Sequence, residues 1–128
     1  MLTKAKDDHS KIVMGLLAYS PEIETTQQVM DELDVFAANE NREIYLWKDE
    51  EADTFIGLIG VEEGDKVVLV RYLTLSPSYR DEGISLKMLE ALSEAYPDTP
   101  ITGTLATTPV IADWQKSRQE KQNTNYQG

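Results

Sequence analysis

The feature that most constrains the fold is a change of hydrophobic period at Ser76-Pro77. Before it, KVVLVRYLTL (66–75) is an almost unbroken apolar run, which predicts a strand. After it, the apolar residues of 84–95 recur at helical spacing until Pro97 ends the pattern. The chain is therefore expected to pass from a strongly apolar strand into an amphipathic helix through one tight turn.

Two further β-like segments precede this strand, at residues 43–48 and 54–62. Short polar turns join the three segments, so they are expected to form an antiparallel meander. The second segment contains Gly57 and Gly60. A glycine inside a strand marks either a bulge or a close approach of another backbone, and the sequence leaves both alternatives open.

The N-terminal part predicts helices. Residues 12–19 have helical spacing and Ser20-Pro21 ends the pattern, while Thr25 or Thr26 can cap a second helix. The first residues can add a short edge strand to the meander.

The C-terminal part predicts a crossover. Residues 101–105 resemble a strand that follows the 84–95 helix at the distance a βαβ unit requires. Pro109 can open a last helix with Trp114 facing inward. The expected fold class is α+β, with one domain over residues 1–120 and a polar C-terminal tail over 121–128.

Composition narrows the function. Twenty-three acidic and twelve basic residues give a formal net charge of −11, which argues against a nucleic-acid partner because phosphate binding needs a basic face. The acidity can attract a cationic substrate or simply keep the chain in solution. The absence of cysteine excludes disulfides and thiolate chemistry. No metal-ligand spacing, signal peptide or membrane-length apolar run occurs, so we expect a cytoplasmic protein without a metal or a membrane partner.

The turn after the strand can bind an anion. A helix start presents unpaired N–H groups and a partial positive charge, and a preceding strand aims them at one point. Gly83 would let a phosphate approach the backbone, and Arg80 would offer a fork of donors. The plainer alternative is that Gly83 only tightens the turn and Arg80 is a surface cation.

The residues from Leu73 to Ser85 resemble the acetyl-CoA motif of the GNAT acetyltransferase superfamily, whose pattern is apolar-x-apolar-x-Pro-x-x-Arg-x-x-Gly-x-Gly/Ala. The order of predicted elements is also similar to that family over most of the chain. Within the superfamily, the stretches KIVMGLLAYSP, REIYLWKDEE and VRYLTLSPSYRDEGIS resemble the RibT group, small acetyltransferase-like proteins of riboflavin-biosynthesis operons.

The resemblance implies an N-acetyltransferase that binds acetyl-CoA and acts on a small-molecule or protein amine. Backbone groups of Leu73 and Leu75 would bind the pantetheine arm. The thioester would lie where the two parallel strands separate, with a backbone N–H polarising its carbonyl oxygen. The pyrophosphate would be wrapped by the amides of Arg80, Asp81, Glu82, Gly83, Ile84 and Ser85.

The chain departs from the family pattern within the loop. Ser85 stands where the family prefers Gly or Ala, with a small expected effect because its backbone N–H persists. Asp81 and Glu82 place two carboxylates beside the expected pyrophosphate, which disfavours cofactor binding unless they point to water.

The chain also departs from the family pattern at the residues that would serve as acid and base. Gln115 falls near the slot of the family's general-acid tyrosine and cannot supply a proton. Glu62 and Tyr72 are the candidate catalytic residues, although Glu62 and its neighbour Glu63 can equally be turn residues.

The chain also lacks the last two strands that the family usually has. The acceptor pocket would then be open or completed by a second subunit, and the free sheet edge can support a homodimer. These departures leave an alternative function, a catalytically degenerate module that binds acetyl-CoA or a protein partner.

Overall fold

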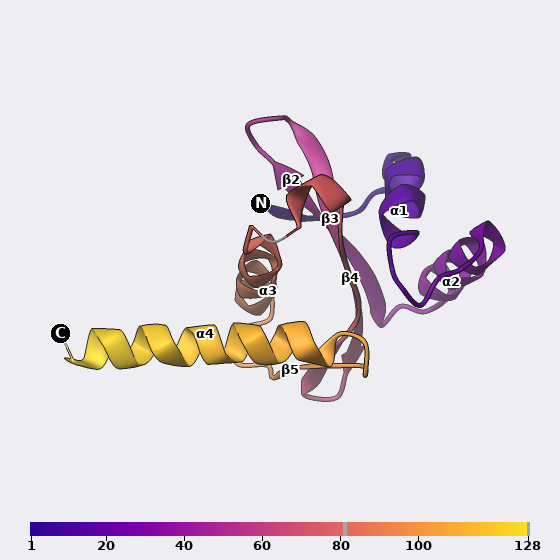
Figure 1. The fold of residues 1–128 in the computed structure, drawn as a ribbon. Helices are drawn as coiled ribbons and strands as arrows, with labels where there is room; N and C mark the ends of the chain where they lie inside the picture. Colours follow the sequence, from indigo (N-terminus) through magenta and orange to yellow (C-terminus); the bar gives the residue numbers. More distant parts are fainter. Residues whose placement is uncertain (81, 128) are drawn as a thin grey trace.

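The computed structural model describes residues 1–80 and 82–127, and from residue 123 onward it describes the backbone alone. One sheet, in the order β1-β2-β3-β4-β5, lies between two layers of helices (Figure 1). The strands are β1 (Leu2–Lys4), β2 (Arg42–Asp49), β3 (Thr54–Gly64), β4 (Val67–Leu75) and β5 (Ile101–Gly103). The helices are α1 (Ser10–Leu17), α2 (Thr26–Ala38), α3 (Ile84–Ala95) and α4 (Thr108–Gln127), with short 3-10 turns η1 (Asp7–His9) and η2 (Pro77–Tyr79).

The meander and the crossover are both confirmed. Strands β1 to β4 pair antiparallel with their neighbours, and β5 joins β4 in parallel after the chain has crossed through α3. The α+β class therefore follows from the change of period at Ser76-Pro77. The expected length of the last strand was wrong, because β5 ends at Gly103 and Leu105 is 98% exposed.

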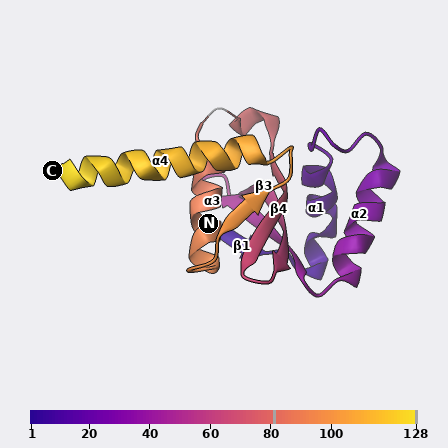
Figure 2. The same cartoon turned by 90° about the horizontal axis from the view of Figure 1, so that it is seen from below.

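Each face of the sheet has its own apolar core. Helices α1 and α2 cover one face, while α3 and α4 cover the other (Figures 1 and 2). The C-terminal half of α4 extends beyond the body of the molecule (Figure 2). In the described part of the chain, no helix combines the length and the apolar character that crossing a bilayer requires.

Local sequence signals explain the helix start and the buried face in the N-terminal layer. Thr25 caps α2 as expected: its hydroxyl accepts a hydrogen bond from the Gln28 N–H at 3.1 Å, and its own N–H donates to Gln28 Oε1 at 3.0 Å. The buried face of α1 consists of Val13, Leu16 and Leu17, as helical spacing predicted.

The bulge explanation holds at Gly60, whereas the close neighbours of both strand glycines are side chains and not another backbone. A Cβ on Gly57 would lie 2.8 Å from Met88 Cε, so α3 packs directly against the backbone of β3. Gly60 lies at a register shift between β3 and β4, and a Cβ there would lie 3.0 Å from Phe36 Cζ. The two glycines therefore allow one helix on each face to approach the sheet.

Strand β5 ends because the side chain of Thr107, the residue just before α4, takes the place of the next strand residue. The Thr107 hydroxyl donates to the Val70 carbonyl of β4 at 2.8 Å and accepts the Thr104 N–H at 3.0 Å. The Gly103 backbone lies directly against this junction, since a Cβ on Gly103 would meet Thr107 Oγ1 and lie 2.6 Å from Ile111 Cδ1.

We expect Gly103→Ala to lower the free energy of unfolding by about 1–3 kcal/mol, because overpacking would displace Thr107 and Ile111. Gly15→Ala is the matched control: a Cβ on Gly15 has no neighbour within 4 Å, and alanine in a helix should raise stability by about 0.5–1 kcal/mol. Urea unfolding measures both changes. Equal effects of the two substitutions would contradict the packing argument.

Candidate functional site

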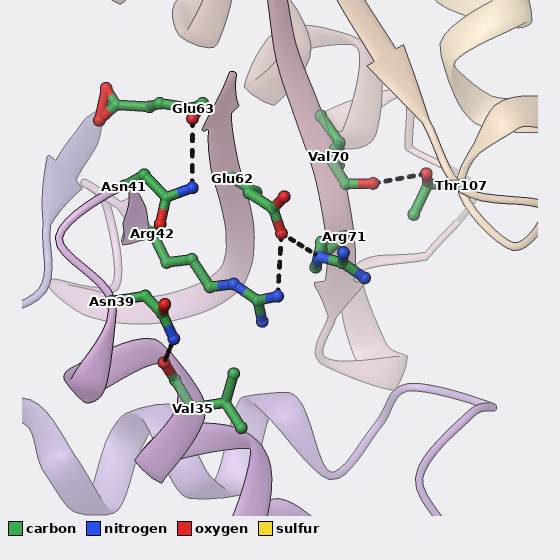
Figure 3. Close-up of polar contacts among 9 residues, drawn as sticks. All are labelled: Val35, Asn39, Asn41, Arg42, Glu62, Glu63, Val70, Arg71 and Thr107. Carbon is green, nitrogen blue, oxygen red and sulfur yellow. Dashed lines mark hydrogen bonds and ion pairs between the residues drawn. The ribbon is translucent and has the colours of Figure 1, made fainter. Parts of the chain in front are cut away.

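The site is centred on the edge of β4 that β5 leaves open. The two strands pair only from Val68–Ile101 to Val70–Gly103, whereas β4 continues to Leu75. The Thr107 hydroxyl bonded to the Val70 carbonyl marks the end of the ladder (Figure 3). The parallel strands therefore separate at this point, as expected for the thioester position.

The backbone of Leu73 and Leu75 faces this open edge. The Ser76 N–H donates to the Ile56 carbonyl of β3 at 2.8 Å. In an antiparallel pair the hydrogen-bonding direction alternates along the strand, so every second residue of β4 before Ser76 also faces β3. Leu73 and Leu75 are the residues in between, and their N–H and C=O groups point away from β3.

A bulge in β4 adjoins the point of separation. Val70 and Tyr72 oppose consecutive residues of β3, which leaves Arg71 as the extra residue. A bulge bends its strand and increases the local twist, so it helps to turn the C-terminal part of β4, up to Leu75, away from β5.

The turn after β4 leads into the start of α3. Gly83 has φ 73°, in the left-handed region that glycine adopts without strain, and it precedes the first residue of α3. Among the described residues, none accepts a hydrogen bond from the amides of Gly83, Ile84 or Ser85. Three donors without a partner in the described part of the chain therefore lie together at a helix start.

The three other residues expected to bind the pyrophosphate are Arg80, Asp81 and Glu82. The Arg80 N–H donates to the Pro77 carbonyl at 3.4 Å, so only the side chain of Arg80 is fully available. Glu82 is exposed and borders a cavity of about 610 Å³ beside the turn. Asp81 lies outside the described residues.

The Arg80 guanidinium lies near the N-terminal helices. Its Cζ is 6.0 Å from the centroid of the Tyr19 ring, and Arg80 is exposed. No carboxylate of the described residues forms an ion pair with it. The guanidinium therefore keeps its donors for a ligand, and Tyr19 is a neighbour that the sequence did not indicate.

Glu62 is held by two arginines (Figure 3). Its Oε1 accepts Arg71 Nε at 2.8 Å and Arg42 Nη2 at 2.9 Å. The hydrogen bond from Arg71 lowers the pKa of Glu62, with a smaller contribution from Arg42. Because β3 extends to Gly64, Glu62 is a strand residue and the turn alternative was wrong. The carboxylate stays ionised at neutral pH and is a weak proton acceptor.

Tyr72 is buried on the α1/α2 face of β4. It is 8% exposed, and its ring centroid is 6.2 Å from that of Phe36. Burial, followed by the nearby carboxylate of Glu32, raises the pKa of Tyr72 to about 12. The hydroxyl therefore keeps its proton at neutral pH, which suits a hydrogen-bond donor and disfavours a role as base.

Gln115 lies away from the open edge. It borders a groove that also includes Tyr96 and Pro97, at the end of α3 opposite to Gly83. The expectation that Gln115 occupies a slot beside the leaving sulfur is not supported by this position. Trp114, in contrast, is buried as expected, with 5% exposure.

The sequence did not identify Thr107, although a signal was present. Thr104, Thr107 and Thr108 cluster just before Pro109, and hydroxyl residues before a helix start are typical capping residues. What the sequence could not show is that Thr107 reaches across to β4.

Comparison with known proteins identifies the family. No protein-family model matches the chain. An uncharacterised N-acetyltransferase encoded in the lysA 3′ region of Bacillus methanolicus is 35% identical over 99 residues, which cover 77% of this chain and 81% of that protein.

Solved structures share the fold at low sequence identity. A probable acetyltransferase has a TM-score of 0.71 at 13% identity, over 91% of this chain and 87% of its own. The aminoglycoside acetyltransferase AAC(6′)-Iy, in complex with a CoA-linked bisubstrate analogue, has a TM-score of 0.67 at 12% identity, over 94% and 87%. A GNAT family acetyltransferase of Staphylococcus aureus has a TM-score of 0.62 at 14% identity, over 81% and 84%.

The mixed sheet, with its separating parallel strands and its helices on both faces, is the fold of the acetyltransferase structures that this chain resembles. The chain belongs to the GNAT superfamily of N-acetyltransferases.

We expect Glu62→Gln to lower the free energy of unfolding at pH 7 by about 1–2 kcal/mol, because two guanidinium groups lose their shared carboxylate. The folded pKa lies below the unfolded value of about 4.3. The contribution is therefore present above the unfolded value and is lost as pH falls through the folded pKa.

Urea titrations of wild type and Glu62→Gln at pH 7 and at pH 3 measure this difference. The exposed Glu51→Gln serves as the control for removing one acidic charge. If the difference in free energy of unfolding between wild type and Glu62→Gln were the same at pH 7 and pH 3, the ion-pair explanation would be contradicted.

Proposed function

We propose that this chain transfers the acetyl group of acetyl-CoA directly to the amine of a small-molecule or protein acceptor. The observation that carries the proposal is the continuity between the open edge of β4 at Leu73 and Leu75 and the free amides that follow Gly83. An extended pantetheine arm can pair with such an edge as a strand would, and a diphosphate is attracted to such a helix start.

The residues present fit acetyl-CoA as a substrate. Gly83 has no Cβ to obstruct a phosphate, and no other atom lies within 4 Å of the position a Cβ would take. The amides of Gly83, Ile84 and Ser85 would bind diphosphate oxygens, and the exposed Arg80 guanidinium would add charge-assisted donors.

The chemistry needs little from the protein beyond placement. Acetyl-CoA supplies an activated thioester. The amine nitrogen forms a bond to the carbonyl carbon, the carbon–sulfur bond breaks, and a backbone N–H at the open edge of β4 stabilises the negative charge on the carbonyl oxygen. Of the two catalytic candidates, Tyr72 is suited to donate a hydrogen bond, and Glu62 is suited to hold Arg71 at the bulge.

The finer assignment is a RibT-like acetyltransferase of the cytoplasm, with residues 1–120 as the domain. The three RibT-like stretches support it, because they meet at the turn after β4. Tyr19 of the first stretch lies 6.0 Å from the Arg80 guanidinium, and residues 47–51 of the second border the same cavity as Glu82. Among structural neighbours, AAC(6′)-Iy bound to a bisubstrate analogue of an aminoglycoside supports a small-molecule amine as acceptor. Pairing of two copies at the free sheet edge remains part of this proposal.

The second candidate is a catalytically degenerate module that binds acetyl-CoA. The position of Gln115 and the two ion pairs of Glu62 favour it, because neither residue then serves as an acid or base. Acetyl-CoA binding without transfer to any amine of a broad panel would identify this function.

We expect acetyl-CoA to raise the melting temperature, since a ligand at 100 times its Kd stabilises the folded state by about 2.7 kcal/mol. Arg80→Ala should weaken acetyl-CoA binding roughly tenfold or more, because charge-assisted hydrogen bonds are worth about 1.5–3 kcal/mol. Calorimetric titration measures the affinity.

Lys116→Ala, on the exposed surface of α4, is the control and should leave the affinity unchanged. If millimolar acetyl-CoA left the melting temperature of the wild-type protein unchanged, the proposed function would be overturned.

A further inference from the structure

The α1/α2 face of β4 carries a polar group that acetyl-CoA binding does not use. Tyr72 and Thr74 are two residues apart on β4, so their side chains share one face of the sheet. Tyr72 packs in the core under α1 and α2, and Glu32 on α2 has its carboxylate near the Tyr72 hydroxyl. The Glu32 carboxylate and the hydroxyls of Tyr72 and Thr74 therefore lie on the side of β4 that α2 covers.

Two atoms of this group are buried without a hydrogen-bond partner. Within the described residues, Thr74 Oγ1 and Glu32 Oε2 have no partner, and Thr74 is only 5% exposed. An unsatisfied buried polar atom costs about 1–3 kcal/mol. A position with a purely structural role would be filled better by valine, which has the shape of threonine, so the retained hydroxyl points to a ligand.

The charge of the group favours a cation. The carboxylates of Glu32 and Glu22 raise the pKa of Tyr72, and the cation that lowers it is Arg71. Arg71 is already bonded to Glu62. Within the described residues no cation forms an ion pair with Glu32. A cationic ligand would therefore meet a carboxylate without a cationic partner, together with hydroxyl oxygens that accept its N–H groups.

The group also lies next to the open edge. Tyr72 and Thr74 flank Leu73, whose backbone groups face the gap left by β5. The two side chains therefore belong to the stretch of β4 along which the proposed function places the pantetheine arm and the thioester.

We propose that Glu32, Tyr72 and Thr74 form the acceptor site, that the acceptor is an alkylammonium compound, and that Glu32 receives its proton. This inference rests on the proposed function. The ammonium gives one proton to the Glu32 carboxylate, and the freed lone pair forms the carbon–nitrogen bond. The carbon–sulfur bond then breaks, the thiolate takes a second proton lost from nitrogen, and the products are an N-acetyl amide and CoA thiol.

The test measures thiol release from acetyl-CoA with two kinds of amine. Cadaverine and benzylamine are cationic at neutral pH, whereas p-anisidine is an uncharged arylamine. Glu32→Gln should lower kcat/KM for the two cationic amines about 100-fold, a typical loss for a proton acceptor, and should affect p-anisidine far less. Thr74→Val should raise KM for the cationic amines roughly fivefold to tenfold, as expected for one hydrogen bond.

Asp34→Asn is the matched control, because Asp34 is an exposed acid on the same helix. It should behave as wild type, and all three variants should keep the affinity for acetyl-CoA. If wild type acetylates the amines and Glu32→Gln does so equally well, this inference alone is overturned. If wild type binds acetyl-CoA and acetylates none of them, the proposed transfer fails and the inference fails with it.

Unfolding measurements separate binding from structure. Under the proposal, Glu32→Gln and Thr74→Val keep or raise the stability of the unliganded protein, since each removes or neutralises an unsatisfied group. A marked loss of stability together with an equal loss of activity toward all three amines would show a structural role and overturn the inference.

Discussion

One hydrogen bond governs the architecture of the site, the bond from the Thr107 hydroxyl to the Val70 carbonyl. It satisfies the first β4 acceptor beyond the end of the β4–β5 ladder. The chain can therefore leave the sheet at Gly103 without leaving the Val70 carbonyl unpaired. The proposed acetyl-CoA site lies beyond that point: the edge of Leu73 and Leu75 on one strand, and the amides of Gly83, Ile84 and Ser85 that have no partner among the described residues.

The local parts of this arrangement could be predicted from the sequence. Strand and helix periods, the cap at Thr25 and the glycine before α3 are properties of neighbouring residues, and all of them appear in the structure. The end of β5 could not be predicted, because residues 101–105 have the composition of a strand and the ladder is ended by the side chain of Thr107, in the turn before α4.

The same limit applies to the side chains of the site. The turn proposed to bind phosphate was predicted from one contiguous motif, whereas the properties of Glu62 depend on Arg42 and Arg71, which come from two other strands. Glu32 was not found at all, since nothing in the spacing of α2 distinguishes it from the exposed acids around it. Only the fold brings it beside Tyr72.

The shared carboxylate of Glu62 also has an evolutionary consequence. Both guanidinium groups bond the same oxygen atom of Glu62. Removing the glutamate therefore leaves two positive charges without their shared carboxylate, while removing one arginine leaves the other as its single ion-pair partner. The effects of substitutions at Glu62, Arg42 and Arg71 are therefore expected to be non-additive. Lineages that change this triad should exchange its members jointly, and covariation among homologues would record that dependence.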